Sequence, residues 1–366
     1  MLISEVTRPL AIAMWDFSWL ERRWPGAGYE DWGRALDELQ ERGYDAVRID
    51  AYPHLFAADP RREWELLPVW NQHDWGSPAL TRVRVEPALN QFIGMCAERG
   101  VKVALSTWFR QDRDDVRMRV HSPADLGRVW KSVLDSIDGA GLLDNILWVD
   151  LCNEWPAPLW APFLEAGSMP SRTRPEIRQW MADSIDVLRQ AYPGLDYCFS
   201  YTAEYTNWRE QDVSFMDLLE PHIWMAQAEV SDFEERMGFD LGRASFDPGM
   251  YEILARNAES LYRKDPDHWK NCLKKGIDLL ADWSRHTDKP LITTEGWALV
   301  AYKDWPLLDW DWVKELCAFG VEEASKTGRW TALSTSHFCG PQFEGMWRDV
   351  EWHRRLTDLI HEGRIG

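Results

Sequence analysis

The sequence predicts an α/β fold, a closed (β/α)8 barrel of the TIM type, and three observations indicate it. Short apolar runs alternate with amphipathic helical patterns eight times along the chain, as expected for strand-then-helix units around a parallel barrel. The length of 366 residues fits one such barrel, so a single catalytic domain over residues 1–366 is expected. No glycine-rich phosphate turn follows the first apolar run, which disfavours an open dinucleotide-binding sheet.

The eight expected strands are short and apolar, and helices with an apolar stripe at 3.6-residue spacing separate them. The strands are Leu10–Phe17, Ala46–Ala51, Val101–Trp108, Ile146–Cys152, Tyr197–Tyr201, Met216–Trp224, Pro290–Thr294 and Arg329–Phe338. The helices are Glu30–Arg42, Pro87–Arg99, Pro175–Tyr192, His268–Arg285 and Trp310–Lys326. One more helix opens at Ser122 and Pro123, since Ser caps a helix and Pro suits its first turn.

Two connections are long, those after the second and sixth strands. The first is Tyr52–Glu86, and the second is an inserted helical excursion over residues 226–289 with an extra helix around Tyr251–Arg263. In a (β/α)8 barrel, function collects at the carboxyl ends of the strands and in the loops that follow them. These two segments are therefore predicted to form walls or lids of a site.

Composition excludes several classes of partner. The net charge of −19, from 41 basic and 60 acidic residues, disfavours nucleic acid and an anionic membrane, which need a basic face. The six cysteines form no Cys-x-x-Cys pair and lie mostly in apolar segments. No leader peptide and no run of membrane-spanning length is visible. We therefore expect a reduced, cytoplasmic protein without a cofactor, and a homo-oligomer is compatible with the sequence.

Tryptophan is the compositional outlier, with 24 residues against 23 glycines. Many lie in predicted loops: Trp64, Trp70, Trp75, Trp155, Trp160, Trp208, Trp297, Trp305 and Trp310. Indole faces suit stacking, so the set as a whole predicts an aromatic-lined cleft. For any single residue, seating a loop on the barrel is an equal alternative.

Two predicted strands end in a glutamate followed closely by a tryptophan. The stretch ILWVDLCNEW ends the fourth strand in Asn153 and Glu154, and LITTEGWA carries Glu295 after the seventh. Strands four and seven lie on opposite sides of a barrel mouth, so the two carboxyls can face each other. Such a pair suits glycoside hydrolysis, in which one carboxyl protonates the departing oxygen and the other attacks or activates water. The alternative for either residue alone is a salt bridge or a helix cap.

These residues resemble the signature of the cellulase-like glycoside hydrolases, the retaining (β/α)8 enzymes of clan A. Within that clan, the stretches VALSTWF, SPADLGRVW and LLDNILWVDLCNEW look like the cellulase-like family, and the resemblance spans most of the chain. It implies Glu154 as the acid/base and Glu295 as the nucleophile, with net retention at the anomeric carbon. It also implies a carbohydrate substrate and no metal.

Further positions match the clan one by one. Arg48, in AVRID, resembles the arginine that holds the nucleophile ionised, since a nearby cation lowers the pKa of a carboxyl. An ordinary ion pair of Arg48 with Asp50 or Asp16 stays open. Asn153 resembles the amide that contacts the sugar 2-hydroxyl, and His222, in EPHIWM, resembles a clan histidine near the nucleophile.

The chain departs from the clan pattern in three places. Trp224 stands where a tyrosine is common two residues after the histidine, and Tyr201 or Tyr205 is a candidate to supply the missing hydroxyl. The third strand ends in Ser106–Trp108 instead of a histidine pair, and the eighth shows His337 without a platform tryptophan. The remaining candidates for sugar contacts, with mouth-lining as the alternative, are Trp15, Asp16, Trp108 and Trp297.

The predicted activity is exo-acting hydrolysis of short β-linked oligosaccharides or glycosides, because an unexported enzyme meets only small imported sugars. A catalytically inactive carbohydrate-binding barrel is the alternative from another class. A metal-dependent sugar isomerase or hydrolase is a third, but the nine histidines are dispersed without ligand spacing.

Overall fold

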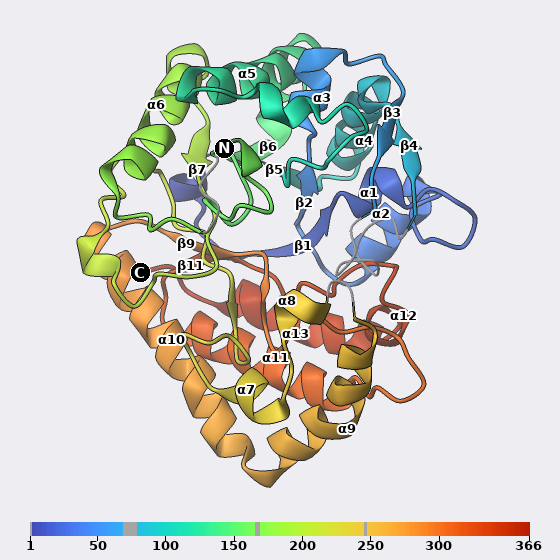
Figure 1. Ribbon diagram of the computed structural model, residues 1–366, viewed down its shortest axis with the longest axis vertical. Helices are drawn as coiled ribbons and strands as arrows, with labels where there is room; N and C mark the ends of the chain where they lie inside the picture. The colour runs from blue at the N-terminus through green and yellow to red at the C-terminus, as the bar shows by residue number, and fades with distance from the viewer. Residues whose placement is uncertain (1, 69–78, 165–168, 245–246) are drawn as a thin grey trace.

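Parallel strands form the centre of the molecule, with the long helices around them (Figure 1). The computed structural model describes residues 2–68, 79–164, 169–244 and 247–366. Seven strands form one sheet in the order β7-β6-β5-β2-β1-β11-β9. In chain order they are β1 (Leu10–Asp16), β2 (Ala46–Asp50), β5 (Lys102–Ser106), β6 (Ile146–Asp150), β7 (Asp196–Cys198), β9 (Leu291–Thr293) and β11 (Trp330–Leu333).

The segment between β7 and β9 closes the ring. Parallel bridges join Leu219 to Leu291 and Tyr201 to Pro221. Directly after them, β8 (Ile223–Trp224) pairs in parallel with β10 (Gly296–Trp297). The predicted sixth strand therefore fits between its neighbours, and the predicted parallel barrel is confirmed. Its eight members follow the order of the sequence.

The barrel helices lie within a few residues of their predicted bounds. They are α2 (Trp32–Glu41), α4 (Val85–Glu98), α5 (Pro123–Gly139), α6 (Pro175–Ala191), α10 (Pro266–Thr287) and α11 (Asp311–Lys326). The predicted cap at Ser122 is present, since its hydroxyl accepts a hydrogen bond from the Asp125 N–H at 3.2 Å. The last helix, α13 (Val350–Glu362), was not predicted, although its apolar residues face inward at helical spacing.

Both long connections carry structure of their own. After β2 come α3 (Pro53–Ala58) and an antiparallel hairpin of β3 (Trp64–Leu66) and β4 (Thr81–Val83). Part of the predicted Tyr52–Glu86 wall, including Trp70 and Trp75, lies outside the described residues. After β8 come α7 (Phe233–Met237), α8 (Leu241–Ala244) and α9 (Gly249–Lys264), ahead of α10. No helix of the described residues is long and apolar enough to cross a membrane.

The loop tryptophans are mostly core residues, which corrects the expectation that they line a cleft. Six of them are less than 10% exposed: Trp64, Trp155, Trp160, Trp208, Trp297 and Trp310. Most of them pack against other rings, as in the cluster of Trp155 with Phe163, Trp180 and Phe199. A barrel with short strands leaves wide gaps under its loops, and large flat side chains fill them.

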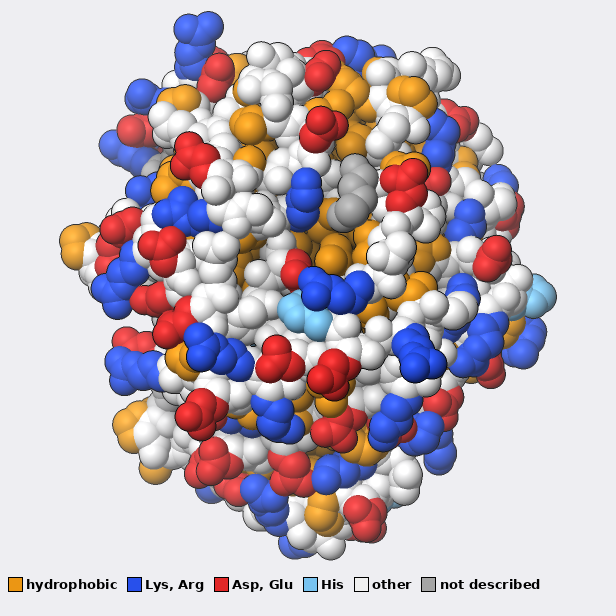
Figure 2. Space-filling model, turned by 180° about the vertical axis from the view of Figure 1, so that it is seen from behind, with side chains coloured by type: hydrophobic (Ala, Val, Ile, Leu, Met, Phe, Trp, Pro, Cys, Tyr) orange, Lys and Arg blue, Asp and Glu red, His pale blue; other side chains and the backbone are white. Residues whose placement is uncertain are grey.

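The outer surface carries charges of both signs. On the face opposite to that of Figure 1, acidic and basic side chains are interspersed, with apolar atoms visible between them (Figure 2). Many of the charged pairs lie one helical turn apart, such as Arg34 with Glu38 on α2 and Lys131 with Asp135 on α5. Such exposed pairs contribute little to stability, typically about 0.3–0.5 kcal/mol each.

Helices α5 and α6 approach closely at Gly127. A Cβ there would lie 2.5 Å from Val187 Cβ and 3.0 Å from the Ser184 carbonyl oxygen. We expect Gly127→Ala to lower the free energy of unfolding by about 1–3 kcal/mol, because the backbone of α6 would have to move. Gly94→Ala in α4 is the control, since a Cβ there has nothing within 4 Å. It should raise stability by about 0.5–1 kcal/mol. Urea unfolding measures both, and a loss of equal size in the two variants would contradict the packing argument.

Candidate active site

The structure brings Glu154 and Glu295 together at the carboxyl ends of the barrel strands. Glu154 lies four residues beyond β6, and Glu295 lies between β9 and β10. An oxygen of each carboxyl and a ring nitrogen of His222 all lie within 4.8 Å of one another. The side chain of Glu295 is 1% exposed and that of Glu154 is 17% exposed. Only Glu154 therefore reaches toward solvent.

A sharp backbone turn aims Glu154 at its partner. Glu154 has a φ of 49°, in the left-handed region that a non-glycine residue rarely adopts. Its N–H donates to Ser200 Oγ at 2.9 Å, and the Trp155 N–H donates to the Ser200 carbonyl. Ser200 Oγ in turn donates to Asp150 Oδ2 at 2.7 Å. Residues at the ends of β6 and beyond β7 thus hold the turn that ends the fourth barrel strand.

Arg48 of β2 is the hub of the site, and it is fully buried. Its guanidinium forms a bidentate pair with Asp16, at 2.8 and 2.6 Å, and donates to Glu295 Oε1 at 2.5 Å. It also donates to Asn153 Oδ1 at 3.1 Å. Arg48 thus contacts Glu295 and forms the ion pair with Asp16 that the sequence left open, and its role in ionising a nucleophile stays a prediction. The Asp50 oxygens instead accept the backbone N–H groups of Tyr52 and Trp108.

His222 lies between Arg48 and the carboxyls of Glu154 and Glu295. Arg48 Nη1 lies 3.1 Å from His222 Nε2, and since arginine can only donate, this nitrogen is the acceptor. The ring proton is then on Nδ1. That atom lies 3.2 Å from Glu154 Oε1 and 3.4 Å from Glu295 Oε1. One imidazole N–H thus faces the two carboxyls at once.

One polar group of the site has no hydrogen-bond partner. The amide nitrogen of Asn153 is buried and unpaired among the described residues, while its oxygen is held by Arg48. A buried donor without a partner is costly, at about 1–3 kcal/mol. An oxygen-bearing ligand would satisfy it.

Burial dominates the electrostatics of the carboxyls. It raises the pKa of Glu295 to about 7, although the neighbouring His222 and Arg48 oppose the shift. Burial likewise raises the pKa of Asp50 to about 7 and that of Asp150 to about 6.

Asp16 and Trp108 are at the site but are engaged with protein groups. The Trp108 indole N–H donates to Asp16 Oδ2, the oxygen that also accepts from Arg48. Both residues are nearly fully buried. They help to fix Arg48, and their contact with sugar stays a prediction.

Trp160 was missed by the sequence analysis as a residue of the site. Its indole nitrogen lies 3.4 Å from Glu154 Oε2, and its ring meets Trp108 edge-on at 4.6 Å between centroids. The sequence named it only among the loop tryptophans. Its spacing of six residues from Glu154, across a loop, gave no signal of contact.

Trp15 and Trp297 lie behind their strands rather than in the mouth. Trp15 packs on Tyr29 and on Phe92 of α4, and its N–H donates to the Cys339 carbonyl. Trp297 packs on Gly320 of α11. Side chains alternate between the two faces of a strand, so Trp15, directly before Asp16, points the other way.

Neither candidate tyrosine replaces the hydroxyl that the clan has near its nucleophile. Tyr201 packs on Trp283 of α10, and its hydroxyl has no partner among the described residues. Tyr205 donates to Gln227.

Trp224 fills the position of the clan tyrosine, edge-on to both His222 and His337. Its indole nitrogen lies 3.3 Å from His337 Nδ1. Burial lowers the pKa of His337 to about 4, so this ring is neutral. Trp224 and His337 are therefore two uncharged side chains in contact, and Trp224 also packs on His222.

The trio of Glu154, His222 and Glu295 has the residue types of a metal site. The buried guanidinium of Arg48 contacts Glu295 Oε1 and His222 Nε2, so a cation there would face a fixed positive charge. The lone pair on His222 Nε2 is already used by Arg48, and Nδ1 carries the proton. Proton transfer between these groups suits the arrangement better than metal binding does.

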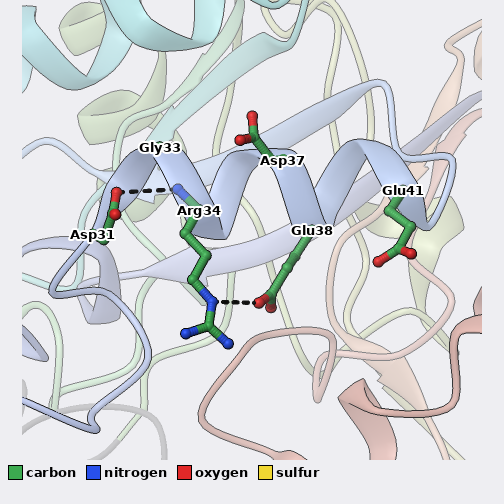
Figure 3. Close-up of a pocket in the computed structure, with 6 residues that line it drawn as sticks. All are labelled: Asp31, Gly33, Arg34, Asp37, Glu38 and Glu41. Atoms are coloured by element: carbon green, nitrogen blue, oxygen red, sulfur yellow. Dashed lines mark hydrogen bonds and ion pairs between the residues drawn. The ribbon is translucent and has the colours of Figure 1, made fainter.

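An acidic hollow on the outer side of α2 is a separate feature (Figure 3). Asp31, Asp37, Glu38 and Glu41 line it with Arg34, which bonds to Asp31 and Glu38. None of these residues contacts Glu154 or Glu295 in the described part of the chain. The hollow is a solvated helix face.

The raised pKa of Glu295 predicts a pH-dependent stability. The folded protein holds this proton up to about pH 7, whereas the ordinary value is 4.5. Stability contributed by the protonated group is present below about pH 4.5 and is lost as the pH rises through 7. Glu295→Gln cannot ionise, so its free energy of unfolding should rise relative to wild type across this window, by up to roughly 3 kcal/mol.

Urea unfolding at pH 5, 6, 7 and 8 measures that difference. Exposed Glu98→Gln on α4 serves as the control and should run parallel to wild type. A constant gap between Glu295→Gln and wild type at all four pH values would contradict the burial argument.

The fold of this chain is similar to that of several solved structures. A candidate glycoside hydrolase from Parabacteroides distasonis is 50% identical, with a TM-score of 0.95 over 98% of this chain and 95% of the other. Two family 5, subfamily 18 glycoside hydrolases share the fold alone. The one from Streptomyces cattleya, in complex with GlcNAc, has 10% identity and a TM-score of 0.55 over 97% of this chain and 80% of its own. The one from Bifidobacterium longum has 13% identity and a TM-score of 0.52 over 90% and 69%.

No curated protein matches the chain in sequence. The family comparison is positive over nearly the whole length: residues 12–361 match the Cellulase-like family, described as sugar-binding and cellulase-like. This agrees with the barrel fold and with the 50% identical relative. Together with the close approach of the Glu154 and Glu295 carboxyls, the match supports a glycosidase. The chain belongs to the Cellulase-like family.

Proposed function

We propose that this protein is a retaining β-glycosidase with Glu154 as the acid/base and Glu295 as the nucleophile. The observation that carries the proposal is the separation of the two carboxyls, whose oxygens approach within 4.8 Å. Retaining enzymes hold their carboxyls about 5–5.5 Å apart, whereas inverting enzymes need about 6.5–9.5 Å to fit a water. The short distance favours direct attack by one carboxylate.

In the first step, a Glu295 oxygen bonds to the anomeric carbon while the glycosidic C–O bond breaks. Glu154 gives its proton to the departing oxygen, and the product is a glycosyl ester on Glu295. In the second step, water attacks the anomeric carbon, the ester bond breaks, and Glu154 takes the proton from the water. The protein returns to its starting state with the configuration retained.

The surrounding residues suit these roles. The Arg48 contact favours the ionised form of Glu295 that attack requires, and the contact also fixes its rotamer. Glu154 is the more exposed carboxyl, with an exposure of 17%, so it faces the side from which leaving group and water arrive. The free amide of Asn153 is available for the sugar 2-hydroxyl, a contact that strengthens in the transition state.

The proposed substrates are short β-linked oligosaccharides or glycosides, cleaved from one end. The long segments after β2 and β8 carry helices and a hairpin that can close one end of the mouth. The nearly complete burial of Glu295, at 1% exposure, fits a pocket better than an open cleft. All six cysteines are free and buried, which is compatible with the proposed cytoplasmic location.

Substitution of the two glutamates tests the assignment on a panel of nitrophenyl β-glycosides. Glu295→Ala should lose at least about 10³-fold in kcat, because no covalent intermediate can form. Azide should restore turnover of Glu295→Ala with an inverted glycosyl azide as product, identified by NMR. Glu154→Ala should keep part of its activity on substrates with acidic leaving groups, since these need no proton.

Other outcomes would identify the alternatives. Binding of sugars by the wild type without any turnover on the panel would favour a catalytically inactive carbohydrate-binding barrel. Loss of activity in EDTA, with recovery on adding a divalent metal, would favour the metal-dependent reading. An inverted product from the wild type would contradict the roles given to the two glutamates.

The mode of attack is tested on a labelled β-linked oligosaccharide. We expect monosaccharide or disaccharide to be released from one end from the first turnover, with no products of intermediate length. Product sizes followed by chromatography measure this. Early release of mixed internal fragments, or a fast fall in the viscosity of a soluble polymer, would contradict exo action.

A further inference from the structure

Glu220 is a second buried acidic partner of Arg48. It comes two residues before His222, just ahead of β8, and is completely buried. Its Oε1 accepts from Arg48 Nη1 at 3.1 Å and from Thr294 Oγ1 at 2.6 Å. Its Oε2 accepts from Trp148 Nε1 at 3.1 Å. Both carboxyl oxygens of this fully buried residue are thus engaged by protein donors.

The guanidinium of Arg48 serves three carboxyls. Asp16 accepts hydrogen bonds from Nε and Nη2 of Arg48, and Glu295 also accepts from Nη2. Glu220 accepts from Nη1. No other arginine or lysine makes an ion pair with these three carboxyls among the described residues. A single positive charge cannot neutralise three negative ones, so each carboxyl limits how strongly Arg48 stabilises the others.

We propose that Glu220 is a positioning residue. By pairing with Arg48 it weakens the stabilisation that Arg48 gives to ionised Glu295, and so it sets how readily the nucleophile Glu295 loses its proton. This rests on the proposed function, since it deepens the role given to Glu295. Glu220 does not touch the reacting atoms. It acts through Arg48, and its negative charge disfavours a second charge on Glu295.

The direction of the effect follows from the sign of the charges. Glu220 as a carboxylate raises the cost of ionising Glu295, and a neutral residue at position 220 lowers that cost. Removing Glu220 also lowers the pKa of Asp150 and that of Cys198, which its charge raises. The other charged and titratable groups that face the two side chains are all retained in such a variant. They are Asp16 from β1, Arg48 from β2, Asp150 from β6, Cys198 from β7, His222 from before β8 and Glu154 from beyond β6.

Infrared difference titration tests the inference without any need for turnover. The carboxylic-acid band of Glu295 is the one that disappears in Glu295→Gln, and its intensity against pH gives the midpoint of ionisation. Glu220→Gln should lower this midpoint by roughly one pH unit, the size of a like-charge interaction across a partly screened buried site. The acidic limb of kcat/KM should move down by the same amount on a substrate that the wild type cleaves.

Matched variants separate charge from packing. Glu220→Met also removes the charge at similar length, and it serves if the Gln variant fails to fold by circular dichroism. Glu220→Asp keeps the charge and should keep the wild-type midpoint, even if kcat falls. Exposed Glu98→Gln removes a distant carboxyl and should change nothing.

The role of Glu220 and the proposed glycosidase function are tested independently. An unchanged Glu295 midpoint in a folded Glu220→Gln or Glu220→Met variant overturns the role of Glu220, whether or not sugars are hydrolysed. An equal shift in Glu220→Asp overturns it as well, because charge would not be the cause. A lowered midpoint in a protein that cleaves no glycoside supports the role of Glu220 and contradicts only the proposed function.

Discussion

The contact of Arg48 with Asp16 and Glu295 is the interaction on which the rest of the site depends. A fully buried guanidinium needs anionic and polar partners, because an unpaired buried charge is very costly. The barrel supplies them from β1, from the segment before β8 and from the loop beyond β9, all at the same end. The partners in turn fix other groups: Asp16 holds Trp108, and Asn153 is held by its oxygen so that its nitrogen stays free. The Arg48 guanidinium thus fixes the positions of Asp16, Asn153 and Glu295 at this end of the barrel.

Closure of the barrel is what allows these contacts. Glu154 and Glu295 are 141 positions apart in the sequence, and they meet only because the segment from Leu219 to Trp224 completes the ring between β7 and β9. That segment also carries Glu220 and His222, whose side chains reach Arg48 from the far side. The same residues that close the barrel therefore complete the charge network. A change that loosens this segment is expected to affect fold and site together.

The aromatic content of the chain serves packing more than recognition. Trp155, Trp208 and Trp297 are buried among other rings or against helices. Trp108 and Trp160 are the exceptions that lie beside catalytic candidates, and both direct their indole nitrogens at carboxyl groups. These two tryptophans hydrogen-bond to the carboxyl groups and help to position them.

The sequence by itself determined the order of strands and helices, the family resemblance and the two glutamates, because each of these is a local pattern. Apolar runs ending in Asn153-Glu154 and before Glu295 mark strand ends whatever surrounds them. It could not decide which face a side chain takes, since a shift of one residue reverses it, and so Trp15 and Trp297 were placed in the mouth although they lie behind it. Only the tertiary structure decided that Arg48 serves Asp16, Glu220 and Glu295 at once and that Trp160 reaches Glu154. The contacts of Arg48 join residues distant along the chain, and that of Trp160 crosses an irregular loop, so no spacing in the sequence encodes them.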